Sequence, residues 1–384
     1  MKKRLFMVAG EASADMHAAS LLKELKNLNP EIECFGVGGP ELRRTGMDII
    51  LESEKLNVVG ISDWFDRMGE VLGGYRSVIK SLKSAPPDLA VLIDLPDFNL
   101  RVAKTLKRLG VPVIYYISPQ VWAWRKYRIN QIRRDVDLMM VVFPFEKEFY
   151  AKEGVEVAFV GHPLLESIRA RSSYRNGSEI KIAPRVALLP GSRRSEVKFH
   201  AQVIVDLAQK IFEKYPKAQL RVPVAQTLSK DFVQEQLKGA NIKIEEENSH
   251  HIIEWADVAV VASGTATLET ALIGTPFALF YKVSSTSAWI YKKLVRFNNF
   301  IGMPNLLQNR EVVKEFFQEE ATPQNLFLEV DKLIQDETYR LSQSSSLLDC
   351  RKKLGDEGAS LKAARNVYSY ITKGPNGEAD RKGE

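Results

Sequence analysis

Short apolar runs alternate with amphipathic stretches along almost the whole chain. This alternation is typical of a parallel β-sheet whose two faces are covered by helices. In the first half, the runs predict strands at residues 4–9, 33–37, 89–93, 113–117, 138–142 and 155–160. Between the first two runs, Leu21, Leu22, Leu25 and Leu28 recur at the spacing of one helix face. The predicted fold class is therefore α/β.

The alternation stops once, at residues 166–184, which are polar and show no period. It resumes with predicted strands at 186–189, 219–224, 242–246, 258–262 and 277–281. We expect two Rossmann-like, doubly wound domains, residues 1–165 and 185–357, joined by a linker at 166–184 and facing a central cleft. A helix at 358–372 is predicted to cross back to the first domain and to precede a polar tail, 373–384.

The composition is that of a globular protein and sets few other limits. With 384 residues, 45% of them hydrophobic and 27% charged, the chain is long enough for two separate cores. No stretch approaches the roughly 18–20 apolar residues of a membrane span. Cys34 and Cys350 show no framework spacing, which favours a reducing cytoplasm. A net charge of +6 does not distinguish anionic lipid from acidic small molecules, and no nucleic-acid-binding motif occurs in the sequence.

Two turns of the second half have the pattern of an anion site. Each follows a predicted strand and opens a helix; they read VALLPGSRRSEV (186–197) and VVASGTATLETALIG (260–274). Glycine lets the backbone approach a ligand, Arg193 supplies a cation, and two helix N-termini together suit a diphosphate. Glu269 is placed to accept hydrogen bonds from a ribose diol. The alternative is that both turns are only capped helices. The candidate residues are Gly191, Ser192, Arg193, Ser263, Gly264, Thr265, Ala266, Thr267 and Glu269.

The first predicted strand is followed by a turn of the same kind, but this turn is acidic. It reads VAGEASADMHAAS (8–20) and carries Glu11 and Asp15. Carboxylates would repel a phosphate there, and their negative charge already neutralises the positive end of the helix dipole. Hydroxyl groups are the ligand chemistry that suits them, since carboxylates accept hydrogen bonds. The alternative for Asp15 is that it only caps and charges the helix start.

A candidate catalytic base ends another predicted strand. The run PDLAVLIDLPDFNL (87–100) leaves Asp94 at the carboxyl end of a buried strand, with Asp97 three residues further on and Asn99 placed to cap the next helix. An aspartate at this place can take a proton from an attacking hydroxyl, so Asp94 is the first candidate base, followed by Asp97 and Glu11. The alternative is that both aspartates are structural and cap the loop or the helix.

Two stretches are unusually rich in apolar and aromatic residues. Residues 60–84 group Trp64, Phe65 and Met68 among glycines, and residues 285–304 interleave aromatic side chains with lysine and arginine. Such stretches lie on anionic lipid in some proteins and are core helices with basic outer faces in others. The five histidines form no zinc motif, and the D-x-D at 135–137 is interpreted as a solvated turn. We therefore expect no metal and no cofactor.

Eight motifs occur in the order found in the lipid-A-disaccharide synthase family. They read VAGEASADMHAAS, DLPDFN, YISPQVWAWR (116–125), FPFEKEFY (143–150), FVGHPL, LLPGSRRSE, ASGTATLE and MPNLLQNREVVKEFFQEE (303–320). The chain resembles this family, which is glycosyltransferase family 19, over residues 4–370. One departure is Ala14, where the family usually has glycine.

The resemblance implies a GT-B glycosyltransferase with its acceptor in the first domain and its sugar nucleotide in the second. It implies transfer from UDP-2,3-diacylglucosamine to 2,3-diacylglucosamine 1-phosphate, which yields UDP and lipid A disaccharide 1-phosphate. The enzyme would be peripheral on the cytoplasmic face of the Gram-negative inner membrane, and a homodimer is left open. Asn305 and Gln318 would line the nucleotide side. The acceptor or lipid side would comprise Asp15, Trp64, Phe65, Met68, Trp122, Trp124 and Arg125.

A mechanism follows from these assignments. Asp94 would deprotonate the acceptor's 6-hydroxyl, which attacks the anomeric carbon in one inverting displacement, while Arg193 and the helix N-termini stabilise the departing UDP. Two other functions stay open at this point. A UDP-N-acetylglucosamine 2-epimerase-like enzyme shares the two-domain architecture but needs no lipid-facing stretch. A non-catalytic lipid- or nucleotide-binding protein would keep the apolar surface but would not need Asp94 as a catalytic base.

Overall fold

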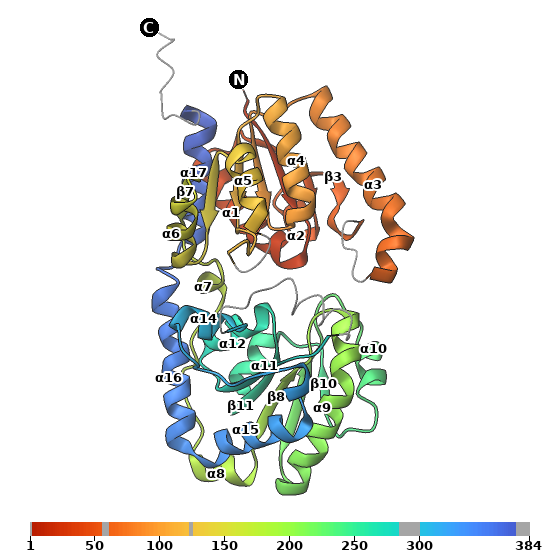
Figure 1. The fold of residues 1–384 in the computed structure, drawn as a ribbon, viewed down its shortest axis with the longest axis vertical. Helices are drawn as coiled ribbons and strands as arrows, with labels where there is room; N and C mark the ends of the chain where they lie inside the picture. Colours follow the sequence, from red (N-terminus) through yellow and green to blue (C-terminus); the bar gives the residue numbers. More distant parts are fainter. Residues whose placement is uncertain (1, 56–60, 123–125, 284–299, 374–384) are drawn as a thin grey trace. The chain divides into compact units, whose positions relative to one another are not determined.

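The computed structural model describes residues 2–55, 61–122, 126–283 and 300–373; within these, the side chains of residues 61–68, 70, 71 and 126 are not described. The chain divides into two compact units (Figure 1). The first comprises Met1–Glu166 and Leu354–Glu384, and the second comprises Ser167–Lys353. The C-terminal segment thus belongs to the first unit, where α17 (Ala359–Lys373) packs along α1 (Ala12–Leu28).

The first unit is a parallel sheet covered by helices, with its described strands in the order β3-β2-β1-β4-β5-β6-β7. The strands are β1 (Arg4–Ala9), β2 (Glu33–Gly38), β3 (Asp48–Glu52), β4 (Leu89–Ile93), β5 (Val113–Tyr116), β6 (Leu138–Val141) and β7 (Val157–Phe159). Between them lie α2 (Pro40–Arg44), α3 (Ile61–Ser84), α4 (Pro96–Arg108), α5 (Ile129–Asp135), α6 (Pro144–Lys152) and the 3-10 turns η1 (Ser53–Lys55) and η2 (Lys126–Arg128). The strand order reverses between β1 and β4, and open α/β sheets bind ligands at such a point.

The second unit repeats this architecture, with its described strands in the order β10-β9-β8-β11-β12-β13. The strands are β8 (Arg185–Leu189), β9 (Gln219–Pro223), β10 (Lys243–Glu245), β11 (Val258–Ala262), β12 (Phe277–Tyr281) and β13 (Glu315–Phe317). The helices are α8 (Gly177–Ile182), α9 (Arg194–Lys214), α10 (Lys230–Gln236), α11 (Ser249–Trp255), α12 (Thr265–Ile273), α14 (Met303–Gln308), α15 (Pro323–Gln335) and α16 (Glu337–Lys353), with α7 (Leu164–Ser167) at the boundary of the units and η3 (Gln318–Glu320) after β13. Here the strand order reverses between β8 and β11.

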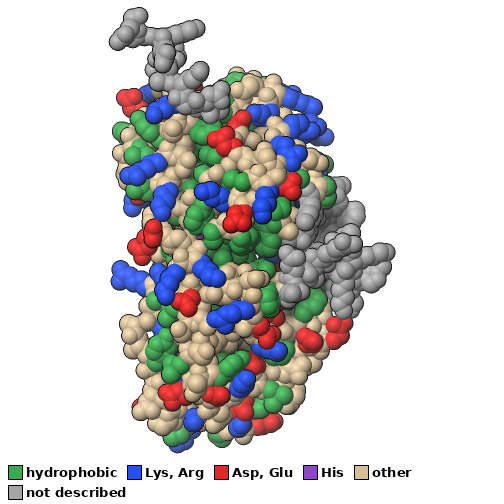
Figure 2. Space-filling model, turned by 60° about the vertical axis from the view of Figure 1, so that its left-hand side comes forward, with side chains coloured by type: hydrophobic (Ala, Val, Ile, Leu, Met, Phe, Trp, Pro, Cys, Tyr) green, Lys and Arg blue, Asp and Glu red, His purple; other side chains and the backbone are tan. Residues whose placement is uncertain are grey.

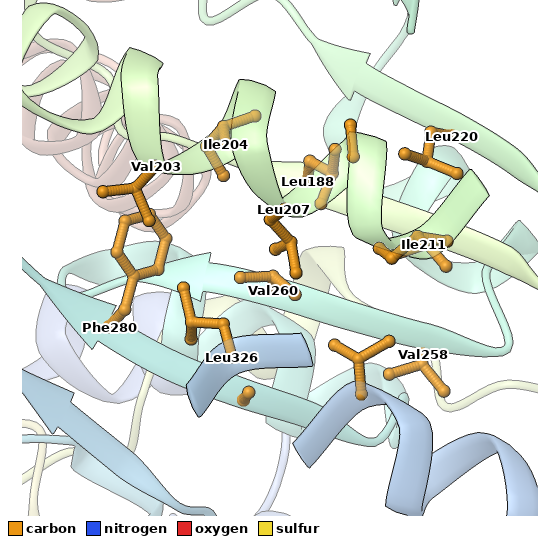
Figure 3. Packing of buried hydrophobic residues seen from close by; sticks show 14 of the residues in the cluster. Leu188, Val203, Ile204, Leu207, Ile211, Leu220, Val258, Val260, Phe280 and Leu326 are labelled. Carbon is orange, nitrogen blue, oxygen red and sulfur yellow. The ribbon is translucent and has the colours of Figure 1, made fainter. Parts of the chain in front are cut away.

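Apolar packing of helices on the sheet holds the strand ends in place. In the second unit, Ile204, Leu207 and Ile211 recur three or four residues apart on α9 and are fully buried. They pack over the sheet together with Leu188 of β8 and Val260 of β11 (Figure 3). Each side chain of this size stabilises the fold by about 1.5–3 kcal/mol when it is fully buried. The strands are covered on both faces, which is why they appear in the sequence as unbroken apolar runs.

The α/β prediction is confirmed, and the predicted strands agree with the observed ones to within two residues. Two observed strands, β3 and β13, were not predicted. Both are short and lie at the edge of their sheet, so each pairs with a single neighbour. Only one residue of each of these two strands is buried, so neither shows the continuous buried apolar run by which the central strands were recognised.

The structure differs from the prediction at residues 166–184, which are not a solvated linker. Most of the segment belongs to the second unit, and it contains α8, which is capped by Asn176 and has a buried Ile180. Its polar side chains make contacts within that unit. Arg175 pairs with the buried Asp257 at 2.6 Å, and Arg171 donates to the carbonyl of Ala256 at 3.2 Å. Two of its polar residues, Arg171 and Arg175, are therefore used in contacts within the second unit.

The surface shows no single large charged field on the face drawn in Figure 2, where basic and acidic side chains alternate. Among the described helices, none is both long enough and apolar enough to cross a bilayer.

Candidate active site

Glu11 and Asp94 lie at the same point of the first sheet. β1 and β4 are parallel neighbours in which Ala9 is opposite Ile93. Glu11 follows β1 as the N-cap of α1, and Asp94 follows β4. A Cβ atom at Gly10 would meet Leu95 Cδ2 at 2.3 Å, so a side chain there would have to displace Leu95. The predicted base and the predicted sugar contact thus lie next to each other, where the strand order reverses.

The backbone around Asp94 is strained. Asp94 has a φ of 49°, Leu95 a φ of 43°, and Ile117, after the adjacent β5, a φ of 61°. Left-handed conformations cost non-glycine residues about 1–3 kcal/mol each, and they concentrate at functional sites. The Asp94 carbonyl is held by two side-chain donors, the Tyr115 hydroxyl and Asn99 Nδ2, the latter at 2.7 Å. The strain and these bonds together determine the direction in which the Asp94 side chain leaves the strand.

Asn99 was predicted to cap α4, and this prediction is wrong. The residue lies inside the helix and is fully buried. Its amide group instead donates back to the carbonyls of Ile93 and Asp94, at 3.1 and 2.7 Å. The amide therefore supports the strained turn. Sequence reasoning placed Asn99 near the helix start correctly but assigned it the wrong partner, because its Nδ2 donates to two carbonyls at the strand end and its Oδ1 is not used to cap the helix.

Asn99→Leu is expected to lower the free energy of unfolding by about 2–4 kcal/mol, because it removes the side-chain donor of the Ile93 carbonyl and one of the two side-chain donors of the Asp94 carbonyl. Equilibrium urea denaturation measures the change. Asn27→Leu is the matched control, since Asn27 is exposed on α1, and it should stay within about 0.5 kcal/mol of the parent. A change equally small for Asn99→Leu would show that the turn does not depend on this amide.

Asp97, the second candidate base, lies in the first turn of α4. Its side chain is 71% exposed and pairs with the guanidinium of Arg128, which is 8% exposed. The ion pair links α4 to the residues that precede α5. Asp97 is therefore already held by a cation, whereas Asp94 is placed by the strand end itself.

Asp15 has a structural role in place of the predicted acceptor contact. It is 2% exposed. Its two carboxylate oxygens accept hydrogen bonds from the amides of Gly39, at 2.7 Å, and Glu41, at 2.8 Å, at the start of α2. A buried carboxylate with both oxygens engaged has no face left for a sugar. Ala14, beside it, is buried inside α1, where alanine is well suited to helical backbone.

The loop after β5 carries three residues that were predicted on the acceptor or lipid side. Trp122 is half-buried, with its ring edge-on to Phe145 at 4.9 Å and its Nε1 donating to Glu146 Oε1 at 3.1 Å. Trp124 and Arg125 lie outside the described residues. The backbone of Trp64, Phe65 and Met68 lies in α3, and their side chains are outside the described part of the structure.

In the second unit, the turn after β8 brings Gly191, Ser192 and Arg193 to the start of α9. The amides of Ser192 and Arg193 both bond to Glu196 Oε2, at 3.1 and 3.3 Å, and the Arg193 guanidinium lies 3.4 Å from Glu196 Oε1. A carboxylate of the chain thus takes the place at this helix start that was predicted for a phosphate. Sequence reasoning missed Glu196, although a glutamate three residues after an N-cap is a known capping signal.

The turn after β11 has the free helix start. Gly264 is the N-cap of α12 with a φ of 154°, and Gly264 and Thr265 are exposed. The first turn of α12 carries no acidic residue, and Thr267 Oγ1 is bonded back to the Gly264 carbonyl at 2.7 Å. No acidic side chain of its own first turn therefore balances its positive dipole end, in contrast to α9, where Glu196 does so. Glu269 lies in the same helix, 3.7 Å from His250 Nε2.

Asn305 and Gln318 are engaged with the backbone of their own unit. Asn305 is fully buried; its Oδ1 accepts from the amides of Val312 and Val313, and its Nδ2 donates to the Val313 carbonyl and to Glu315. These bonds order the turn before β13, and the place of Asn305 on the nucleotide side, which the resemblance implied, stays a prediction. Gln318 has a φ of 51° and bonds both the amide and the carbonyl of Val283, at 3.1 and 3.3 Å.

The D-x-D of residues 135–137 is not a solvated turn. Asp137 accepts from the Val113 amide at 2.8 Å and from Lys107 at 2.6 Å, and Asp135 is buried beside Arg134. Within the described ranges, no three His, Cys, Asp or Glu side chains are grouped as a metal site. His162 is buried, and burial together with the nearby His17 lowers its pKa to about 3, so it stays neutral.

Comparison with known proteins identifies relatives that match nearly the whole chain. Residues 5–366 match the model of a family described as lipid-A-disaccharide synthetase. The lipid-A-disaccharide synthase of Anaeromyxobacter dehalogenans is 38% identical over 374 residues, which is 96% of this chain and 97% of that protein. The lipid-A-disaccharide synthase of Geobacter metallireducens is 38% identical, over 97% of this chain and 98% of that protein.

Among solved structures, the S. aureus MnaA–UDP co-structure aligns with a TM-score of 0.65 at 13% identity over 97% of each chain. Acinetobacter baumannii MurG aligns with a TM-score of 0.55 at 14% identity, over 97% of this chain and all of its own. Two doubly wound units of this kind define the GT-B class of glycosyltransferases and related epimerases. Likeness at such identities concerns the fold alone.

The relatives at 38% identity decide the family: the chain belongs to the lipid-A-disaccharide synthetase family. It is a glycosyltransferase of lipid A disaccharide synthesis, as the resemblance of the eight motifs implied. The epimerase-like and non-catalytic alternatives are not favoured, because the family match covers nearly the whole chain.

Proposed function

We propose that the protein transfers a diacylglucosamine unit from UDP-2,3-diacylglucosamine to the 6-hydroxyl of 2,3-diacylglucosamine 1-phosphate, with inversion. The products are UDP and the lipid A disaccharide 1-phosphate. Family membership supports the reaction class. The observation that carries the assignment of the site is the strained, doubly bonded turn that presents Asp94 beside Glu11 where the first sheet reverses its strand order.

The acceptor binds at the carboxyl ends of β1 and β4, where the strand order of the first sheet reverses. Asp94 takes the proton from the 6-hydroxyl as that oxygen bonds to the anomeric carbon and the bond to UDP breaks. Glu11, half-buried at the N-cap of α1, accepts hydrogen bonds from sugar hydroxyls. Asp97, three residues after Asp94 and paired with Arg128, is the alternative base.

The donor's diphosphate binds at the start of α12, at residues 263–267, with Arg193 as the cation. This assignment is supported by the contrast between the two helix starts, since Glu196 occupies that of α9 and no acidic residue is present in the first turn of α12. As UDP leaves, its negative charge grows, and a preorganised cation and helix dipole stabilise it in the transition state. Glu269 accepts from the ribose diol.

A direct assay tests the proposed reaction. The purified protein is incubated with both acylated sugars in detergent, without added divalent metal, and UDP and the disaccharide are followed by mass spectrometry. Equal amounts of the two products are expected. Release of N-acetylmannosamine from UDP-N-acetylglucosamine would identify a 2-epimerase, and binding of the acylated sugars without turnover would identify a carrier; either result contradicts the proposal.

We propose further that α3 brings the enzyme to the membrane surface on the cytoplasmic face, where both acylated substrates reside. Leu72 is 41% exposed on this helix, between the exposed Gly69 and Gly73. The C-terminal half of α3 borders a shallow pocket of about 430 Å³ whose lining combines apolar and basic side chains: Tyr75, Arg76, Ile79, Lys80, Lys83 and Ser84. An exposed apolar residue followed by a basic face is typical of an interfacial helix on anionic lipid.

Replacing Lys80 and Lys83 together by alanine is expected to weaken binding to phosphatidylglycerol vesicles roughly 30-fold, because each basic residue near an anionic surface contributes about 1 kcal/mol. Vesicle sedimentation measures the partition. Lys217 and Lys238, exposed in the second unit, form the matched control pair. Equal loss in both pairs would mean that α3 has no special part in docking. Light scattering of the same samples tests the homodimer left open by the sequence.

A further inference from the structure

Glu146 is a carboxylate buried beside the loop that follows β5, and its side chain is 1% exposed. Oε1 accepts hydrogen bonds from Ser118 Oγ at 2.5 Å and from Trp122 Nε1 at 3.1 Å. Oε2 accepts one from the amide of Phe143 at 3.1 Å. A single carboxylate therefore ties both ends of the segment 118–122 to the first turn of α6.

Other contacts also hold the segment 118–122: Val121 is buried in the hydrophobic core of the first unit, and its amide donates to the Pro119 carbonyl at 2.6 Å. The Tyr150 hydroxyl donates to the Pro119 carbonyl at 3.2 Å, and the Trp122 ring packs on Phe145. Residue 117, which leads into the segment, is left-handed. The segment begins at the carboxyl end of β5, whose Tyr116 is paired with Ile93 of β4, immediately before Asp94. The segment thus lies at the carboxyl ends of the central strands, where the acceptor is proposed to bind.

Keeping a carboxylate at this place lowers the stability of the fold. Burial raises the pKa of Glu146 from 4.5 to about 7, against the opposing effect of the bonds from Ser118, Phe143 and Trp122. Because the folded-state pKa is the higher one, stability falls as pH rises from about 4.5 through 7. Tyr150 faces the carboxylate from the same helix, and its own pKa is raised by burial and by Glu146.

Glutamine has the shape of glutamate but accepts fewer hydrogen bonds. A carboxylate meets the donors of Ser118, Trp122 and Phe143 at once, whereas an amide offers one acceptor oxygen and turns two N–H donors toward the rest. Glutamine would therefore remove the ionisation cost and leave the Trp122 indole or the Phe143 amide without an acceptor. The carboxylate is suited to fixing the loop, at the expense of stability.

We propose that Glu146 is a positioning residue for the acceptor, which holds segment 118–122, and Trp122 with it, in place beside Asp94. The inference rests on the proposed function, because it requires the acceptor to bind at the carboxyl ends of β1 and β4 in the first sheet. Glu146 does not touch the reacting atoms; it acts through the loop that it anchors.

The test compares Glu146→Gln with Glu148→Gln, a control on the exposed side of the same helix. For Glu146→Gln we expect the KM for the acceptor to rise about tenfold or more, since small misplacements near a reacting centre have effects of this size or larger. The KM for the donor should change less than about twofold, and Tm at pH 8 should not fall. Ser118→Ala, which removes one donor and buries no new group, should shift the acceptor KM in the same direction.

Three results would overturn the inference. An unchanged acceptor KM in Glu146→Gln, with Asp94→Asn inactive, would remove Glu146 from acceptor positioning and leave the proposed function standing. A rise in the donor KM alone would contradict the placement of the acceptor on the first unit, and with it the proposed function. A lower Tm with kcat and both KM values changed in equal measure would assign Glu146 a purely structural role.

Discussion

Asp94→Asn is expected to lower kcat by roughly 10²–10⁴-fold, the usual contribution of a general base, while UDP still binds with the affinity of the parent enzyme. Asparagine keeps the size of the side chain and adopts a positive φ more readily than most residues, so it does not add strain at the 49° φ of residue 94. Loss of activity would therefore report the lost proton acceptor and not a disturbed turn.

The measurement combines initial rates of disaccharide formation with calorimetric titration of UDP. Asp48→Asn is the matched control, because Asp48 is exposed at the first residue of β3, and it should retain full activity. Asp97→Asn and Glu11→Gln are measured in parallel. Near-normal turnover of Asp94→Asn, together with a large loss in Asp97→Asn, would move the base to Asp97 and assign Asp94 to support of the turn.

Arg193→Ala is expected to lower kcat/KM for the sugar nucleotide by roughly 10²–10³-fold and to weaken UDP binding, because it removes a preorganised charge from the leaving group. In the structure its guanidinium lies 3.4 Å from Glu196 Oε1, so the arginine is already directed by a carboxylate at the start of α9. Arg193→Lys should recover only part of the loss, since lysine lacks the planar fork of arginine.

The adjacent residue provides the control for this prediction. Arg194 stacks on the ring of Phe232, with its Cζ atom 4.1 Å from the ring centroid, and Arg194→Ala should leave UDP affinity within about twofold of the parent. Isothermal titration with UDP and steady-state rates separate binding from transfer. If Arg193→Ala bound UDP as tightly as the parent, Arg193 would have no place in the diphosphate site.

Much of the fold was predictable because the central strands are buried on both faces. Burial on both faces requires long apolar runs, and these are visible in the sequence without any knowledge of partners. The turns after β1, β4, β8 and β11 could be chosen as candidate ligand positions for the same reason, since each follows such a run directly. The edge strands β3 and β13 have one neighbour each and gave no comparable signal.

The partners of polar side chains were less predictable. Glu146 and Glu196 both lie in the first turn of a helix that follows a strand, and both accept from the backbone there. The spacing of a glutamate three residues after an N-cap was the available signal, but neither N-cap is the serine or threonine that usually accompanies it. Asp15 and Asn305 were assigned to ligands, and the structure engages both with backbone groups of their own unit.

The sequence by itself determined the α/β class, the positions of the central strands, the family and the residues that follow each strand end. These depend on apolar periodicity and on local motifs, which are properties of neighbouring residues. Only the tertiary structure decided the partners of two other carboxylates: Asp15 accepts from the amide of Gly39, and Glu146 accepts from Ser118 and Trp122 in the loop after β5. These donors lie 24 to 28 residues away along the chain, and folding brings them within about 3 Å of the carboxylate oxygens.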